Sequence, residues 1–145
     1  MERISLNRKT ILQQMYKRLI RNFLDILILQ ELRSKPLSGY DIISLIHKRF
    51  NLLISSGSIY SMLYSLEREG LVRGGWVGRK RVYILTNKGR TVLEAVIKSR
   101  VKVERIIFQI FSKNSKKYVM GAKVMEADKK KTSEMLKDIS GYVKI

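Results

Sequence analysis

Three consecutive cations, Arg79, Lys80 and Arg81, are the residues of this sequence with the clearest chemical potential. They belong to a stretch, residues 70–93, that contains no Asp or Glu and carries three more cations, Arg73, Lys88 and Arg90. Guanidinium and ammonium groups bind phosphate oxygens, and cations gathered in one segment are typical of a surface that holds a polyanion. The alternative is that these side chains only solubilise an exposed turn.

The charge of the whole chain points the same way. Its 145 residues include 30 Lys and Arg against 12 Asp and Glu, a formal net charge of +18. Such a surplus favours nucleic acid as a partner first and an anionic membrane surface second. The apolar fraction of 45% indicates a chain that folds around a core and is not a disordered polyelectrolyte.

The sequence contains few residues that could catalyse a reaction or bind a metal ion. The chain has no cysteine and one histidine, His47, so thiolate sites, histidine metal sites and Ser-His triads lack their components. No phosphate-binding glycine loop, dinucleotide fingerprint or catalytic pair of acids is present. We therefore expect no enzyme, no metal and no cofactor. The longest apolar run near the N-terminus, Ile26–Leu29, is too short to span a membrane, and no signal peptide is visible, so we expect a cytoplasmic, nucleoid-associated protein without a membrane partner.

The elements that position these residues are mostly helical. Helical spacing predicts an amphipathic N-terminal extension over residues 1–18, an apolar helix over 19–32, a third over about 39–50 and a fourth over about 56–69. A turn around Pro36 separates the second and third of these, where Tyr40 is expected to pack against the domain. The predicted caps and stops are Ser38, the serines at 55–58 and Gly70.

The apolar period then changes from that of a helix to that of a strand. Residues 71–77 and 81–85 read as two strands around a cationic turn at 78–80, and the only tryptophan, Trp76, is expected to pack this hairpin onto the domain. A long helix follows over about 87–112, with Thr86 and Asn87 as candidate caps. Residues 113–145 form a basic C-terminal extension that we expect to be partly helical.

The long helix has an apolar seam that calls for a partner. Its residues approximate a heptad repeat, with one polar exception at Arg100: Leu93, Val96, Arg100, Val103, Ile107 and Ile110. The same seam on a second copy would cover it, which predicts a homodimer.

Several short motifs, in order and at matching spacing, resemble the PadR family of transcription regulators. They are Phe23–Leu29 (FLDILIL), Pro36–Ile42 (PLSGYDI), Gly57–Tyr60 (GSIY), Leu66–Val72 (LEREGLV), Val82–Thr86 (VYILT) and Gly89–Arg90. The resemblance covers about residues 20–100, and Ser61 stands where the family usually has proline. It implies a winged helix-turn-helix, a mainly α fold with a small β-hairpin, in a dimeric DNA-binding repressor or activator whose C-terminal helix supplies the dimer interface. The expected domains are the extension at 1–18, the DNA-binding domain at 19–90, the dimerisation helix at 91–112 and the extension at 113–145.

In a helix-turn-helix, the second helix of the motif enters the major groove. Here the side chains opposite the apolar face of the helix at 56–69 are Ser58, Tyr60, Ser61, Tyr64, Ser65 and Arg68. With Arg73, Arg79, Lys80, Arg81 and Lys88 on the wing, they form the predicted DNA-binding set. Both tyrosines have a competing role as half-buried packing residues. No Asn or Gln lies on this helix, so base reading rests on few groups.

We therefore predict a homodimeric regulator, in particular a repressor, that binds specific double-stranded DNA with this helix in the major groove and the wing on the backbone or minor groove. The alternatives are a weakly selective architectural DNA-binding protein and an RNA-binding or scaffold module. The resemblance leaves one alternative role for Trp76, since aromatic residues near the interface of some PadR-like proteins bind flat ligands; nothing else in the sequence supports a small-molecule effector.

Overall fold

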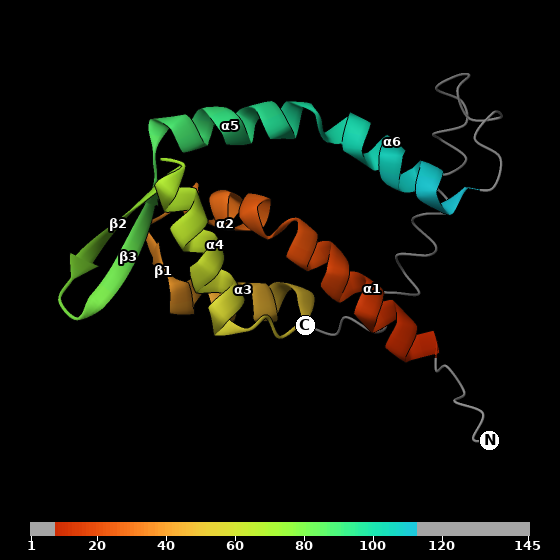
Figure 1. The fold of residues 1–145 in the computed structure, drawn as a ribbon, viewed down its shortest axis with the longest axis horizontal. Coiled ribbons are helices and arrows are strands. Elements are labelled where there is room, and N and C mark those ends of the chain that lie inside the picture. The colour runs from red at the N-terminus through yellow and green to blue at the C-terminus, as the bar shows by residue number, and fades with distance from the viewer. Residues whose placement is uncertain (1–7, 113–145) are drawn as a thin grey trace. The chain divides into compact units, whose positions relative to one another are not determined.

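The computed structural model describes residues 8–112, in which six helices and three strands follow one another (Figure 1). Their order is α1 (Arg8–Asn22), α2 (Leu24–Leu32), β1 (Leu37–Ser38), α3 (Gly39–Phe50), α4 (Ser56–Arg68), β2 (Val72–Val77), β3 (Lys80–Leu85), α5 (Asn87–Lys98) and α6 (Arg100–Phe111). The chain divides after Glu94 into two compact units, which are described separately. The expectations for residues 1–7 and for the extension at 113–145 lie outside the described residues.

Local capping signals fix the two helices of the helix-turn-helix motif. Ser38 is the N-cap of α3, and a capping box joins it to Asp41, as predicted for the serine. Ser55 is the N-cap of α4, because its hydroxyl accepts a hydrogen bond from the Ser58 amide at 3.2 Å. The predicted bounds of both helices are confirmed to within a residue.

The core of the first unit joins α2, α3, α4, the sheet and the start of α5. Its least exposed side chains come from the inner faces of the helices and from β2: Ile28, Leu29, Ile42, Ile46, Ile59, Leu63, Val72 and Leu93. α2 is buried along much of its length, as its apolar sequence predicts, but it begins at Leu24 and not at residue 19. The break falls at Phe23, whose backbone (φ −112°, ψ 20°) leaves the helical region.

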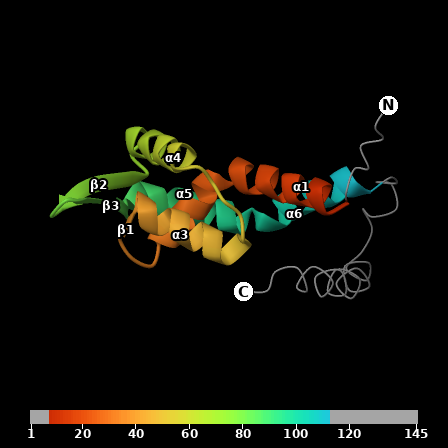
Figure 2. The ribbon, with the colours of Figure 1, turned by 90° about the horizontal axis from the view of Figure 1, so that it is seen from below.

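The sheet has three antiparallel strands in the order β1-β3-β2. The hairpin was predicted, and its turn is the two residues Gly78 and Arg79, with Gly78 at φ +62°. The strand β1 was not predicted, because two residues carry no alternating pattern. It pairs Leu37 with Tyr83 and Ser38 with Val82, which attaches the start of α3 to the wing. Figure 2 shows the hairpin extending from one end of this unit.

Hydrogen bonds close the base of the hairpin onto the helices. Gly70 ends α4 with φ +76°, as predicted for a helix stop. The Thr86 hydroxyl donates to the carbonyl oxygens of Gly70 (2.7 Å) and Leu71 (3.0 Å) and accepts from the Gly89 amide at 3.0 Å. These hydrogen bonds fix the wing at its base.

Two further expectations about helices are wrong. The helix expected over 87–112 is two helices, because the backbone of Ser99 (φ −87°, ψ 3°) leaves the helical region. Three-residue hydrogen bonds accompany the four-residue bonds there: the Ser99 amide donates to the Val96 carbonyl and the Lys102 amide to the Ser99 carbonyl, both at 3.0 Å. Tyr40 does not pack against the domain, since it is 70% exposed where α3 begins. Within residues 8–112, no helix has the length and apolarity to cross a membrane.

Candidate nucleic-acid interface

Helix α4 turns one polar and aromatic face to solvent. Ile59, Leu63 and Leu66 are buried on the opposite side. On the outer face, Tyr64 is 69% exposed and Tyr60 46% exposed. Ser61 and Arg68 are also exposed, and the Arg68 guanidinium lies 5.9 Å from the centre of the Tyr64 ring. The structure thus brings four of the six predicted side chains of this helix onto one outward face.

The other two predicted side chains of α4, Ser58 and Ser65, are half-buried at the edge of that face. The Ser58 and Ser55 hydroxyls lie 2.7 Å apart, and the Ser65 hydroxyl donates to Glu69 at 3.3 Å. With Ser61 they line a shallow groove whose other side comes from α1 and α2. The full lining is Arg21, Leu24, Ser58, Ser61, Met62 and Ser65. Arg21 was missed from the sequence, because no local pattern shows that the end of α1 lies beside α4.

Tyr60 has a packing role that the sequence did not reveal. A Cβ atom built on Gly39 would overlap the Tyr60 ring, so the ring lies directly on the first residue of α3. This contact joins the SGY and GSIY motifs in space. Tyr60 is therefore both a packing residue and part of the exposed face.

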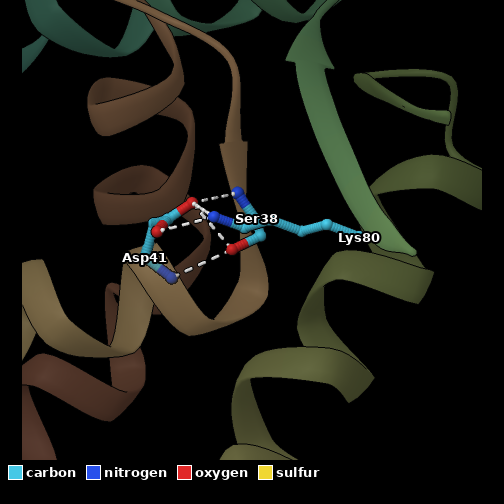
Figure 3. Close-up of polar contacts among 3 residues, drawn as sticks. All are labelled: Ser38, Asp41 and Lys80. Atoms are coloured by element: carbon cyan, nitrogen blue, oxygen red, sulfur yellow. Dashed lines mark hydrogen bonds and ion pairs between the residues drawn. The ribbon is translucent and has the colours of Figure 1, made fainter. Parts of the chain in front are cut away.

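Two of the three wing cations are paired with carboxylates from helices. The Lys80 ammonium lies 2.9 Å from an Asp41 oxygen, and the same carboxylate accepts from the Ser38 hydroxyl (2.7 Å) and amide (2.9 Å), as Figure 3 shows. The hydrogen bond from Lys80, followed by those from Ser38, lowers the pKa of Asp41 from 3.8 to about 2. The capping residue of α3 thus also holds β3.

Arg81 is held in a similar way by α4. Its guanidinium lies 2.7 Å from one Glu67 oxygen, while the Gly74 amide donates to the other at 3.0 Å. A Cβ atom at Gly74 would lie 2.6 Å from the Arg81 Nε and 2.7 Å from the Glu67 Oε2. Glycine at this position is therefore what lets the two side chains meet across the wing.

These pairs change the electrostatics predicted for the wing. The stretch at 70–93 is free of acids in sequence, but Asp41 and Glu67 approach it in space and pair with two of its cations, Lys80 and Arg81. Within the described residues, Arg79 makes no ion pair and lies in the turn itself. The Lys88 ammonium donates to the Glu69 carbonyl at 2.7 Å and so caps the end of α4. Arg73 is exposed on β2.

Trp76 departs from its prediction. It does not pack the hairpin onto the domain, because the hairpin extends past the core, and its side chain is 70% exposed. The next residue, Val77, is 68% exposed. The wing therefore presents an apolar pair beside its cations.

One residue of the predicted dimer seam is already used inside the monomer. Leu93 is 1% exposed in the core of the first unit, so it cannot reach a second copy. Val96, Val103 and Ile107 are half-buried, and Ile110 is 72% exposed. Arg100 pairs with Glu104 at 3.2 Å. No residue of α6 is buried, and its exposed apolar residues also include Val101, Ile106, Phe108 and Phe111.

Helices α2, α3 and α4, followed by a β-hairpin that closes onto α4 and leads into α5, define a winged helix-turn-helix domain. In helix-turn-helix proteins, the second helix of the motif enters the major groove. Residues 28–95, which contain these elements, match the Transcriptional regulator PadR-like family. The winged-helix domain of this chain is therefore similar to the PadR-like family. Members of the family regulate transcription and are not enzymes.

Solved structures of transcription regulators have the same fold. A PadR family transcription regulator from Clostridium difficile is 24% identical (TM-score 0.56) over 62% of this chain and 99% of its own. A PadR family transcriptional regulator from Eggerthella lenta is 23% identical (TM-score 0.65) over 76% and 100%. A PadR-like transcriptional regulator from Bacillus cereus is 24% identical (TM-score 0.58) over 67% and 99%. No curated protein matches the chain.

Proposed function

We propose that this winged-helix regulator is a homodimeric repressor that binds specific double-stranded DNA, with α4 in the major groove and the wing on the backbone or the minor groove. The observation that carries the proposal is the outward face of α4, with Tyr60, Ser61, Tyr64 and Arg68, beside a wing whose turn carries Arg79. A helix presented in this way fits the major groove, and a basic hairpin beside it meets the adjacent backbone.

The ion pairs of the wing support different roles for its cations. Exposed ion pairs contribute only about 0–1 kcal/mol each, so the pairs of Lys80 and Arg81 can exchange a carboxylate for a phosphate at small cost. Before DNA binds, these ion pairs hold the hairpin against α3 and α4. In this proposal Arg79 binds a phosphate directly, and Lys80 and Arg81 first orient the wing.

Helix α6 supports the homodimer. A helix with apolar residues on most of its surface requires cover, and Ile110 (72%) and Phe111 (65%) are among its most exposed side chains. A second copy of the same helix offers a matching surface. A dimer bound to an operator prevents other proteins from using that DNA, and repression is the direct consequence that we propose.

The composition of α4 favours one second candidate, an architectural protein that binds DNA with little selectivity. The outward face of α4 carries hydroxyl groups and one long side chain that donates hydrogen bonds, Arg68. It has no Asn or Gln that could make a bidentate hydrogen bond to adenine. Selectivity then depends on DNA shape or on few contacts.

A salt titration of duplex binding tests the proposal. The affinity of the wild type, measured by anisotropy of a labelled duplex, should fall steeply with salt as counterions are released. Arg79→Ala should weaken binding and reduce the slope of log K against log salt by about 0.9, the value for one phosphate contact. The control is Lys48→Ala, an equal charge change at the exposed far end of α3, which should leave the slope unchanged. Equal slopes for both variants, or no duplex binding at all, would contradict the proposal.

A further inference from the structure

The only tryptophan of the chain, Trp76, lies exposed on the wing and outside the hydrophobic core. Trp76 is 70% exposed, and the core is complete without it. An indole ring can bury a large apolar area, so exposing it to water forgoes a stabilisation that a more central position would provide. Such a side chain on a binding element points to a contact made only in a complex.

Strand register fixes the side of the wing on which Trp76 lies. In the antiparallel pair, Trp76 is directly opposite Arg81, and directly opposite residues place their side chains on the same face of a sheet. Arg81 reaches Glu67 of α4, so this is the face turned toward the recognition helix. Val77 is opposite Lys80, which reaches Asp41 of α3, and therefore lies on the other face.

The positive charges near Trp76 indicate which kind of molecule it contacts. Arg81 lies directly opposite Trp76 on the facing strand, and Lys80 and Arg79 follow it toward the turn. A hydrophobic protein surface would have to desolvate these charges, whereas duplex DNA neutralises them and offers the apolar surfaces of its sugars between the phosphates.

We propose that Trp76 contacts duplex DNA directly, its ring packing against the sugars and base edges of the groove beside α4 while the neighbouring arginines bind the flanking phosphates. This inference rests on the proposed function, since it requires that α4 and the wing meet the same duplex. It assigns Trp76 an apolar contact that does not depend on salt, in addition to the ionic grip of the wing. A contact with the sugars tolerates many sequences, because every nucleotide carries the same sugar.

The single tryptophan gives a direct spectroscopic test. Its emission can be excited apart from the seven tyrosines, and acrylamide, which is uncharged and so is not repelled by DNA, measures its accessibility. In the free protein, acrylamide should quench the emission nearly as well as it quenches free tryptophan. With a saturating duplex, the quenching constant should fall several-fold. Heparin, a polyanion without stacked bases, should leave it close to the free value.

Affinity measurements with matched variants complete the test. Trp76→Ala should weaken duplex binding about tenfold, which corresponds to ~1.4 kcal/mol, while the slope against salt stays that of the wild type. Trp76→Phe should retain most of the affinity. Val77→Ala removes an equally exposed apolar side chain from the other face and should change binding less than twofold. Thermal unfolding of each variant should match the wild type, because neither side chain is buried.

The outcomes separate this inference from the proposed function. If anisotropy shows duplex binding but the quenching constant does not fall, or Trp76→Ala binds as well as Val77→Ala, the wing grips DNA by charge alone and the inference is wrong. If Trp76 becomes protected on raising the protein concentration without DNA, its partner is a second copy of the chain, which also overturns the inference. If anisotropy shows no duplex binding, the proposed function and the inference both fall.

Discussion

Replacing Asp41 with asparagine removes the charge that joins α3 to the wing and keeps the shape of the side chain. The carboxylate accepts from the Ser38 amide at 2.9 Å and from Lys80 at 2.9 Å, and the amide oxygen of asparagine can keep the first of these. We expect Asp41→Asn to lower the free energy of unfolding near neutral pH. Its effect measures what the ion pair and its hydrogen bonds contribute.

The magnitude follows from the pKa of Asp41. A fall from 3.8 to about 2 corresponds to ~2.4 kcal/mol at 1.36 kcal/mol per pKa unit. Because the Asp41 side chain is 34% exposed, solvent screening reduces this figure, and we expect a loss of about 1 kcal/mol. For a chain of this size that is a decrease in Tm of about 3–5 °C.

The loss of stability in Asp41→Asn should depend on pH. The pKa of Asp41 is lower in the folded state, so its stabilisation is present above 3.8 and is lost as the pH falls toward 2. The difference between wild type and Asp41→Asn should therefore be full at about pH 6 and shrink to about half at about pH 3.

Urea unfolding at the two pH values is the assay. The control is Glu94→Gln, the same charge change at an exposed site on α5 that has no ion pair among the described residues. A difference for Asp41→Asn that does not change with pH, or one no larger than that of the control, would refute the reasoning.

Two other predictions concern packing and assembly. Gly89→Ala places a Cβ atom against the Leu71 carbonyl oxygen, so it should lower the free energy of unfolding in urea by about 3 kcal/mol. The control is Gly75→Ala, which has open space around it and should be close to neutral. Equal stabilities of the two variants would contradict this account of the wing base. Ile110→Asp places a charge on the most exposed apolar residue of α6 and should shift sedimentation toward the monomer about tenfold more than Gln109→Asp, its polar neighbour. An undisturbed dimer in Ile110→Asp would place the interface elsewhere.

Features set by neighbouring residues were predicted well. The caps at Ser38 and Ser55, the stop at Gly70 and the hydroxyl of Thr86 act over a few residues, and each lies where the sequence indicates. The alternating strands and the helical faces follow from equally local periods. The order of these elements was enough to indicate a winged helix.

Features that join distant residues were not predictable in the same way. Lys80 and Asp41 are 39 positions apart and Arg81 and Glu67 are 14 apart, so the acids that partly neutralise the wing cannot be found in its own sequence. The heptad pattern included Leu93 because periodicity finds an apolar face without saying what covers it. An aromatic residue in a strand fits both a packed and an exposed position, and Trp76 proved to be exposed.

Selection of bound fragments from a pool of random duplexes tests the central claim most directly, that α4 and the wing read specific DNA as a homodimer. The account predicts enrichment of an inverted repeat whose half-sites are about one helical turn apart. The enrichment should persist when selection is repeated at higher salt, since base contacts depend on salt less than phosphate contacts do. Recovery of fragments with no common sequence would contradict the claim and favour an architectural protein.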